Sequence, residues 1–464
     1  MPLCRSDWRQ QRRTGSSYQR MCIMKTRYFL SFFIATLTAV WAWDALYMHP
    51  MSGTLPWVVQ RHGLYLTGIL SIGLMSLVMV LATRPAWLEG PMGGMDKLYN
   101  VHKWAGILAV LFGAAHWLVK LGSSELADLI GKEGRPAKEA ALFFAQSWRS
   151  PAKDLGEWAI YILLGLLVLA LWKRLPYRPW RALHRSMPVI YLILVFHTVA
   201  LLPASYWVGA TGVLMAVLLP AGSLAAVMSL AQRIGQKRRH AGRVFSIAQH
   251  GDVLEVVCEP DSQWPAHRPG QFAFLTFDRA EGAHPFTIAC AAKTGSRRIS
   301  FQIKALGDYT RTLGQHLYVG QPVQIEGPYG RLDYRDGRPD AAQVWVAGGI
   351  GVTPFLAWLE HLKEHPTDTP VHMHYCIRDA GADPLVERVR ALCSVAPNVT
   401  LHIHDTSACQ RLDADGVLEY SRPVGRKMDV WFCGPVAFAK SLETDLRAAL
   451  GRGVLMHREA FDMR

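Results

Sequence analysis

Cysteine is sparse in this sequence, and it follows no metal-binding pattern. The 464 residues include eight cysteines, and none of them forms a C-x-x-C pair or a plant-type iron–sulfur spacing. Six of the eight lie after residue 240, which the charge pattern assigns to the cytoplasm, where thiols stay reduced. The cysteines therefore predict neither an iron–sulfur cluster nor a disulfide framework.

Long apolar runs are missing from the second half of the chain. After residue 240 no stretch reaches the roughly 20 residues that a spanning helix needs, and the pattern becomes that of an α/β protein. Before residue 232 there are six such runs, of which the fourth is short and needs its flanks. We expect spans at Tyr28–Met48, Gly63–Ala82, Val101–Leu121, Trp158–Trp172, Met187–Pro203 and Trp207–Leu230.

Basic residues outnumber acidic ones at the N-terminus and in the fourth connection between these runs. The first 27 residues carry seven basic residues, and the fourth connection, KRLPYRPWRALHR, has five basic residues and no acid. The connection at 122–156 instead balances its charges. This positive-inside pattern places the N-terminus, the even-numbered connections and the C-terminal part on the cytoplasmic side. The net charge of +14 therefore indicates membrane topology and not nucleic-acid binding.

The segment that begins at Met24 also resembles a secretory signal peptide, with a basic start and a small-x-small end. We favour an uncleaved first span, because an odd number of spans would break the alternation of charge. The expected location is the inner (plasma) membrane, crossed six times.

Four histidines lie in these apolar runs, in two pairs. His102 and His116 are 14 residues apart in the third run, and His184 and His197 are 13 residues apart at the fifth. Fourteen residues of helix cover about 21 Å, most of a hydrocarbon core of about 30 Å. Imidazole is an axial ligand for haem iron, so two parallel helices with these histidines can hold two haems stacked across the bilayer.

The alternative for each histidine is a hydrogen bond to a neighbouring helix, which is common for one such residue but harder to accept for four. Helix geometry supports the first pair, whose members are within about 40° of one face, but not the second, at about 140°. Pro188 suggests an irregular helix start after His184. Arg61 is a candidate partner for haem propionates, with snorkelling to the interface as the alternative.

Residues 241–338 read as short strands with turns, as in a small β-barrel. The segments HPFT, beginning at His284, and GDYT, beginning at Gly307, offer an aromatic ring, a hydroxyl and backbone donors of the kind a flavin needs. From residue 339 strands alternate with helices, as in a nucleotide-binding fold. There the apolar strand before AGGIGVTPF leads through a glycine turn into a helix start, a site suited to a pyrophosphate.

Two pairs of histidines, then HPFT, GDYT, GPYG, AGGIGVTPF, CGP and a C-terminal aromatic residue, in this order, resemble the ferric reductase and NADPH oxidase superfamily. The resemblance covers about residues 28–464. It implies a membrane all-α six-helix haem bundle plus a cytoplasmic β-barrel FAD domain and an α/β nucleotide-binding domain. The expected parts are a basic cytoplasmic N-terminus (1–27), the six-span domain (28–232), the FAD domain (241–338) and the NAD(P) domain (339–464).

The resemblance also implies roles for individual residues. The haem ligands are His102 with His184 at the inner leaflet and His116 with His197 at the outer leaflet. The flavin contacts are His284, Pro285, Phe286, Thr287, Gly307 and Thr310. The nicotinamide nucleotide contacts are Gly348, Gly349, Gly351, Thr353, Pro354, Gly434 and Pro435, with Arg378 associated with NADPH preference. The residues nearest the hydride transfer are Thr287, Cys433 and Phe461, the last of which covers the flavin.

The implied function is that of a transmembrane flavocytochrome b. Electrons pass from cytoplasmic NAD(P)H, with NADPH preferred, through FAD and two b-type haems to a small acceptor outside. We expect ferric chelates as that acceptor, with reduction of dioxygen to superoxide or supply to a periplasmic redox protein as alternatives. A membrane channel or haem sensor with a relic reductase tail is the alternative from another class, and the intact HPFT, GIGVTP and CGP segments argue against it.

Overall fold

The computed structural model describes residues 26–137, 139–140, 142–172, 177–421 and 426–459. Most of the expected basic N-terminal segment lies outside the described residues. The chain divides into two compact units, residues 1–234 and 235–464. The first unit is helical, and the second contains both β-sheets.

Six helical segments of the first unit are long and apolar enough to cross a membrane, which confirms the six predicted spans. They are Tyr28–Met48, Leu55–Ala82, Met95–Ile130, Phe143–Leu171, Pro179–Leu201 and Ala210–Leu230. The fourth run gains the length it lacked from residues on its N-terminal side. The helices of this unit are α2 (Thr26–Trp43), η1 (Asp44–Met48), α3 (Leu55–Ala82), α4 (Ala86–Met92), α5 (Met95–Ile130), η2 (Phe143–Trp148), α6 (Arg149–Leu171), α7 (Tyr177–His184), α8 (Met187–Leu201), α9 (Ala204–Trp207) and α10 (Ala210–Leu230).

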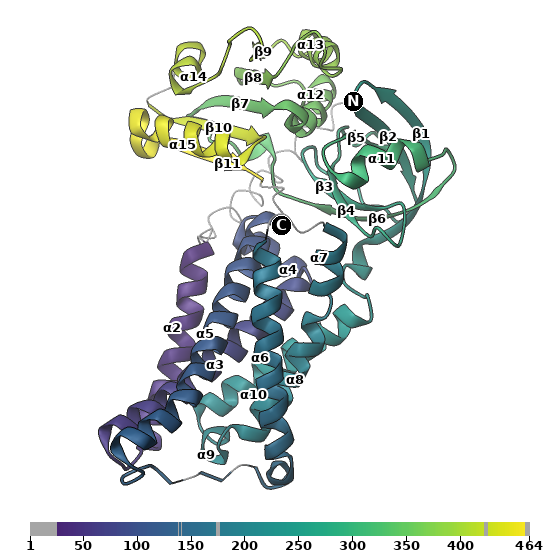
Figure 1. Ribbon diagram of the computed structural model, residues 1–464. Helices are drawn as coiled ribbons and strands as arrows, with labels where there is room; N and C mark the ends of the chain where they lie inside the picture. The colour runs from purple at the N-terminus through teal and green to yellow at the C-terminus, as the bar shows by residue number, and fades with distance from the viewer. Residues whose placement is uncertain (1–25, 138, 141, 173–176, 422–425, 460–464) are drawn as a thin grey trace, which may run out of the picture. The chain divides into compact units, whose positions relative to one another are not determined.

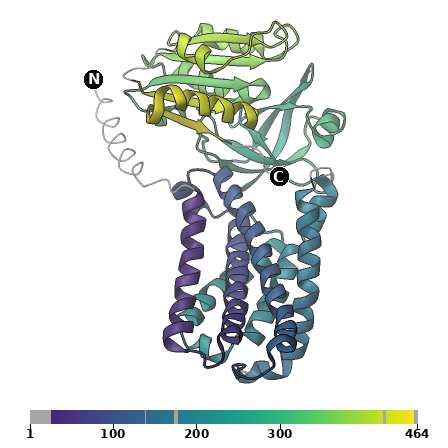
Figure 2. The ribbon, with the colours of Figure 1, turned by 60° about the vertical axis from the view of Figure 1, so that its left-hand side comes forward.

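The spanning helices pack side by side as a bundle (Figures 1 and 2). Helix α3 lies between α5 and α10, and α8 packs against both α6 and α10. Buried polar contacts join three of them: the hydroxyls of Ser76 on α3 and Tyr191 on α8 are 2.9 Å apart, and the Tyr191 hydroxyl donates to the carbonyl of Leu219 on α10 at 3.3 Å. A Cβ at Gly222 on α10 would lie 2.1 Å from the Tyr191 hydroxyl, so only glycine admits this ring.

A buried carboxylate caps the last spanning helix. Asp44 is 1% exposed, and its oxygens accept the backbone N–H groups of Ala210 (3.1 Å) and Thr211 (2.5 Å) at the start of α10. The negative charge there stabilises the positive end of the helix and satisfies donors that have no partner within it. This contact fixes the end of α2 against the start of α10, far apart in sequence.

The second unit begins with a six-stranded antiparallel sheet in the order β4-β3-β6-β1-β2-β5. An isolated bridge between Ile288, after β4, and Phe301 of β5 joins the two edge strands, so the sheet curls around its apolar core as a barrel does. Its elements are η3 (Gln236–Arg238), β1 (Arg239–His250), β2 (Val253–Pro260), β3 (Phe272–Thr276), β4 (His284–Thr287), β5 (Ile299–Lys304), α11 (Asp308–His316), β6 (Pro322–Tyr329) and η4 (Tyr334–Asp336).

A parallel five-stranded sheet follows, in the order β11-β10-β7-β8-β9, with helices on both faces (Figure 1). Its strands are buried on both sides, since Trp345 packs with α12 and α13 while Val344 and Val346 pack with α14 and α15. Its elements are β7 (Ala342–Gly348), η5 (Gly349–Val352), α12 (Thr353–Glu364), β8 (Val371–Ile377), α13 (Val386–Ser394), β9 (Val399–Asp405), α14 (Ala414–Tyr420), β10 (Met428–Cys433), α15 (Val436–Leu450), η6 (Gly451–Gly453) and β11 (Val454–Arg458).

Polar contacts hold the two sheets of the second unit together. Arg388 on α13 bonds to Glu255 of β2 at 2.7 Å and to Glu360 of α12 at 3.1 Å. The Trp358 indole N–H donates to the carbonyl of Pro269 at 3.0 Å. Because these groups are largely buried, the contacts fix the sheets at a defined separation.

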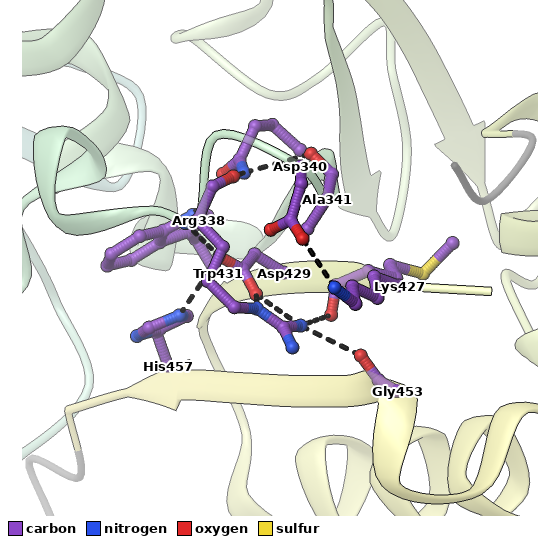
Figure 3. A network of polar contacts seen from close by, with 10 residues as sticks. Arg338, Asp340, Ala341, Lys427, Asp429, Trp431, Gly453 and His457 are labelled. Carbon is purple, nitrogen blue, oxygen red and sulfur yellow. Dashed lines mark hydrogen bonds and ion pairs between the residues drawn. The ribbon is translucent and has the colours of Figure 1, made fainter. Parts of the chain in front are cut away.

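A buried ion pair anchors β10, the strand next to the edge strand β11 (Figure 3). Asp429 is 0% exposed and accepts hydrogen bonds from the backbone N–H of Arg338 (2.6 Å) and from its Nε (2.7 Å). The same guanidinium donates to the carbonyl of Gly453 at 2.8 Å. Arg338 therefore ties the segment that precedes the parallel sheet to β10 and to η6, the turn that leads into β11.

Removing the Asp429 charge is expected to destabilise the second unit. Asp429→Asn leaves Arg338 without a counter-charge, and we expect a loss of about 2 kcal/mol, below the usual figure for a fully buried pair because Arg338 is partly exposed. The measurement is the thermal unfolding midpoint of the purified chain. Asp340→Asn, which removes the exposed ion pair with Lys427 in the same network, is the control and should leave the midpoint unchanged. Equal effects of the two substitutions would contradict this assignment.

Candidate functional site

The four histidines of the first unit meet in two pairs. The ring centroids of His102 and His184 are 6.1 Å apart, and those of His116 and His197 are 6.2 Å apart. His102 and His116 both lie on α5, whereas His184 ends α7 and His197 lies on α8. The pairs therefore lie about 21 Å apart along α5, and the third and fifth spans run parallel.

A break in the fifth span accounts for the 13-residue spacing. Helix α7 ends at His184, and α8 begins at Met187 with Pro188 in its first turn. Proline has no N–H to continue the α7 hydrogen-bond ladder, so the chain restarts as a new helix. His184 and His197 are thus not on one helical wheel, and the 140° offset does not apply. The expected irregular start is observed.

In three of the four imidazoles a hydrogen bond engages Nδ1 and leaves Nε2 available to bind a metal ion. Nδ1 faces a backbone carbonyl in three of them: Val78 for His102 (3.2 Å), Leu64 for His116 (2.8 Å) and Ala152 for His197 (2.7 Å). A carbonyl can only accept, so these Nδ1 atoms carry the proton and Nε2 keeps its lone pair. Ligand histidines in metal sites are oriented in the same way.

His184 is held differently. Its Nδ1 is buried and has no hydrogen-bond partner among the described residues, and its ring stacks on Trp180 with centroids 5.2 Å apart and planes within 8°. A stacking contact fixes the plane of the ring but not which nitrogen carries the proton.

The separation of the rings fits a metal ion between them. A metal–imidazole nitrogen distance of about 2 Å on each side places two opposed ring centroids about 6 Å apart. Both pairs have this separation, and both lie in an apolar bundle. The residues present therefore fit haem iron with two axial histidines.

Two glycines make room for the second pair, and the sequence interpretation missed both. A Cβ at Gly156 on α6 would lie 2.1 Å from Nδ1 of His197, and one at Gly68 on α3 would lie 3.0 Å from Nδ1 of His116. Small residues in apolar helices mark close packing, but the sequence does not say which neighbour they admit.

Arg61 lies two turns before Gly68 on the same face of α3, the face that contacts His116. Its guanidinium reaches the carbonyl of Pro136 at 3.5 Å. The side chain is half-buried and belongs to the end of the bundle where the second pair lies, as a partner for propionates would.

The flavin segment lies on an edge strand of the antiparallel sheet. The strand HPFT is β4, where Phe286 pairs with Ala273 and Thr287 with Phe272 of β3. The His284 ring stacks on Tyr309 at 4.3 Å, which brings HPFT to the GDYT segment. The Tyr309 hydroxyl is buried without a hydrogen-bond partner among the described residues, so a bound cofactor can satisfy it.

The second flavin segment forms the start of α11. Gly307 precedes the helix, and Thr310 Oγ1 accepts the backbone N–H groups of Leu306 and Gly307, both at 3.0 Å. A Cβ at Gly307 would meet no atom, so the helix start is open to an approaching group. A helix N-terminus with this opening suits a phosphate oxygen.

The two nucleotide motifs of the parallel sheet pack directly on each other. A Cβ at Gly351 would lie 2.2 Å from the carbonyl oxygen of Cys433, and one at Gly348 would lie 2.7 Å from Pro435 and 3.3 Å from Gly434. The close approach of the turn to the end of β10 therefore requires glycine. Gly349 has φ +55°, which also favours glycine.

The turn leads directly into α12. Thr353 is buried and donates its hydroxyl to the carbonyl of Ile350 at 3.1 Å, and Pro354 occupies the first turn of α12. Arg378 follows β8 and is exposed, with its carbonyl held by the Ser407 N–H at 2.9 Å. These residues and Cys433 lie at the carboxyl ends of parallel strands, where ligands of such sheets bind.

Cys433 is buried at the end of β10, and burial, with a smaller effect of the Glu459 carboxylate, raises the pKa of its thiol to about 12. It is therefore a neutral thiol at physiological pH and not a nucleophile. Phe461 lies outside the described residues. The last described residue, Glu459, accepts the backbone N–H of Arg331 at 2.7 Å, beside the antiparallel sheet.

Two family matches cover the two kinds of site. Residues 67–195 match the ferric reductase like transmembrane component family, and residues 243–333 match an FAD-binding domain family. The chain joins a ferric reductase-like membrane component to an FAD-binding domain. The first match includes His102, His116 and His184 and ends two residues before His197. The second includes HPFT and GDYT.

Several curated proteins are similar to part of this ferric reductase-like chain. It is 31% identical over 116 residues to the reductase component of propane 2-monooxygenase from Mycolicibacterium goodii, covering 25% of this chain and 33% of that protein. It is 26% identical over 190 residues to the toluate 1,2-dioxygenase electron transfer component of Pseudomonas putida, and this match covers 39% of this chain and 55% of that protein. The chain thus spans about a third to just over half of the length of these relatives.

Solved structures show weak similarity. Flavohemoglobin from Malassezia yamatoensis, solved with FAD and haem, aligns with 88% of this chain and all of its own at 16% identity and a TM-score of 0.47. The FAD/NAD-binding domain of nitric oxide dioxygenase from Vibrio cholerae aligns with 47% of this chain and 98% of its own length, at 18% identity and a TM-score of 0.39. The assignment rests on the two family matches and not on these similarities.

Substitution of Gly351 tests the packing of the nucleotide turn. In Gly351→Ala the new methyl group meets the Cys433 backbone, which cannot move without disturbing β10, and we expect a loss of roughly 1–3 kcal/mol. Thermal unfolding of the purified chain measures it. Gly381→Ala, in the turn between β8 and α13, where a Cβ makes only an ordinary contact at 3.5 Å, is the control. An unchanged midpoint for Gly351→Ala would show that the turn does not pack as described.

Proposed function

We propose that the chain is a transmembrane flavocytochrome b that moves electrons from NAD(P)H through FAD and two b-type haems to an acceptor on the other side of the membrane. The observation that carries the proposal is the geometry of the two histidine pairs, whose ring separations of 6.1 and 6.2 Å suit an iron atom held between them. A single pair would serve a haem sensor, whereas two pairs about 21 Å apart span most of a hydrocarbon core.

The cofactors supply the redox chemistry, since bound FAD accepts a hydride and releases single electrons, and haem iron carries one electron at a time. The protein positions them. Nδ1 of His102, His116 and His197 donates a hydrogen bond to a backbone carbonyl, so Nε2 of each ring is the nitrogen that would bind iron. Arg61 supplies a positive charge for haem propionates at the second pair.

The second unit binds the electron donor. In our proposal Phe286, Thr287 and the start of α11 hold the flavin and its pyrophosphate, and the turn at Gly348–Gly351 holds the nicotinamide nucleotide beside Cys433. Exposed Arg378 at the end of β8 is placed to meet a 2′-phosphate, which supports a preference for NADPH over NADH.

The charge pattern supports a location in the inner (plasma) membrane with the second unit in the cytoplasm. The histidine pair nearest the even-numbered connections, His102 with His184, then lies at the inner leaflet, and His116 with His197 lies at the outer leaflet. The acceptor meets the outer haem.

We propose ferric chelates as that acceptor. Residues 122–156, which include the end of α5 and the start of α6, contain no cysteine or histidine. This disfavours a dedicated iron site there, but a bulky ferric chelate can still meet the haem edge directly. The positive charge of Arg61 at that end favours anionic chelates. Dioxygen and a periplasmic redox protein remain the alternatives that the experiment distinguishes.

The experiment is turnover in proteoliposomes that contain the full chain. NADPH or NADH is added on the side of the second unit, and ferric citrate, dioxygen or a quinone is offered separately on the other side. We expect NADPH to drive ferric reduction, and His116→Ala to abolish it while leaving flavin reduction intact. Reduction of cytochrome c that superoxide dismutase abolishes would favour the oxidase alternative, and no transfer across the membrane would contradict the proposal.

Gly156→Ala tests the ligand role of His197 without removing a histidine. The new Cβ meets the His197 ring at 2.1 Å, so the ring has to turn away from His116. We expect purified Gly156→Ala protein to retain about half of the haem of the parent chain, as measured by the haem absorbance per polypeptide. Gly165→Ala on the same helix, where a Cβ meets nothing within 4 Å, is the matched control and should keep all of it. Full retention by both variants would contradict the assignment of the second pair.

A further inference from the structure

Four histidines outside the site described above line one face of the parallel sheet at its edge. His372 and His374 lie on β8, and His402 and His404 lie on the neighbouring edge strand β9. Nδ1 of His372 is 3.2 Å from Nε2 of His402, and Nδ1 of His374 is 3.0 Å from Nε2 of His404. We name these four residues the histidine ladder.

The rings of the ladder are nearly parallel and packed together. The ring planes of His372 and His402 are 14° apart, and those of His374 and His404 are 25° apart. His374 also stacks on His402 with ring centroids 4.9 Å apart. Tyr420, at the end of α14, covers the His402 ring at 4.3 Å. Four rings with alternating positions on adjacent strands thus form one continuous imidazole surface.

The rings of the ladder are buried or half-buried. Burial, with the neighbouring histidines adding to it, lowers the pKa of His374 to about 3, and burial lowers the pKa of the other three as well. His374 is 0% exposed, and its Nε2 has no hydrogen-bond partner among the described residues. Neutral imidazoles keep a lone pair, which is the form that binds a metal ion.

We propose that the histidine ladder binds one divalent transition-metal ion, with Nδ1 of His372 and Nε2 of His402 as its protein ligands. Two nitrogens that bind one tetrahedral ion at about 2.0 Å lie about 3.3 Å apart, close to the 3.2 Å observed. When the ion binds, the proton of this hydrogen bond moves to the other nitrogen of its own ring, so that both facing nitrogens offer a lone pair, and rotations about the broad χ2 torsion direct them toward the ion. Both side chains are half-exposed, so the ion has a path of entry.

The ligand set selects the class of ion. Imidazole suits zinc, nickel and copper, whereas magnesium and calcium prefer oxygen ligands. Among the described residues no group of three or more histidine, cysteine or acidic side chains converges on one point, so water completes the coordination of the ion. The inner pair, His374 with His404, supports the site by packing on His402.

Isothermal titration of the full chain, purified without a polyhistidine tag, with zinc chloride tests the proposal. We expect one zinc ion per chain at the ladder, at least tenfold weaker binding in His372→Gln/His402→Gln, and no heat from magnesium chloride. His361 and His365 on α12 are the matched control, because they form another stacked pair, with centroids 4.4 Å apart. Their Gln double variant should bind as the parent chain does. An unchanged titration of the ladder variant, or loss of binding in the α12 variant, would overturn the proposal.

Hydrogen exchange of the unsubstituted chain gives a second readout that does not depend on the folding of a variant. A zinc ion at this site joins the edge strand β9 to β8, so saturating zinc should slow amide exchange in Val399–Asp405. Protection that appears only on α12, or no protection at all, would contradict a site at the ladder.

Discussion

An imidazole in an apolar bundle has two nitrogens to satisfy, and this constraint organises the first unit. In three of the four histidines Nδ1 donates a hydrogen bond to a backbone carbonyl, which leaves the lone pair on Nε2. The rings of each pair are separated by a distance that suits a metal ion. The arrangement requires an unbroken α5 to carry two histidines about 21 Å apart and a broken fifth span to present their partners. It also requires glycine where α3 and α6 pass the rings. The unbroken α5, the break in the fifth span and the close packing at the glycines therefore all serve to place the four imidazoles.

The second unit depends on a comparable close approach, in this case between backbones. The turn at Gly348–Gly351 lies against the end of β10 at distances that no side chain permits, and the buried Arg338–Asp429 pair fixes the same strand from its other end. β10 is thus held at both ends, at the carboxyl edge by the glycine turn and at the other end by the ion pair. A rigid strand at the carboxyl edge is what a nucleotide site on a parallel sheet requires.

Much of the fold could be predicted from the sequence, because membrane spans and strands depend on the local pattern of apolar residues. The six spans and the change to an antiparallel and then a parallel sheet are confirmed. The break between His184 and Met187 was only suggested by Pro188, since a proline predicts a disturbance but not its form. Gly156 and the Nδ1 partners could not be assigned, because they depend on which helices become neighbours. The histidine ladder had a signal that was missed: HMH and HIH repeat with the period of a strand.

The central claim is that each histidine pair holds one haem through two imidazoles. The most direct test is the haem content per polypeptide of the purified chain together with its low-temperature electron paramagnetic resonance spectrum. The account predicts two haems per chain, both low-spin and six-coordinate with two nitrogen ligands. One haem per chain, or a high-spin five-coordinate signal that accounts for either site, would contradict it.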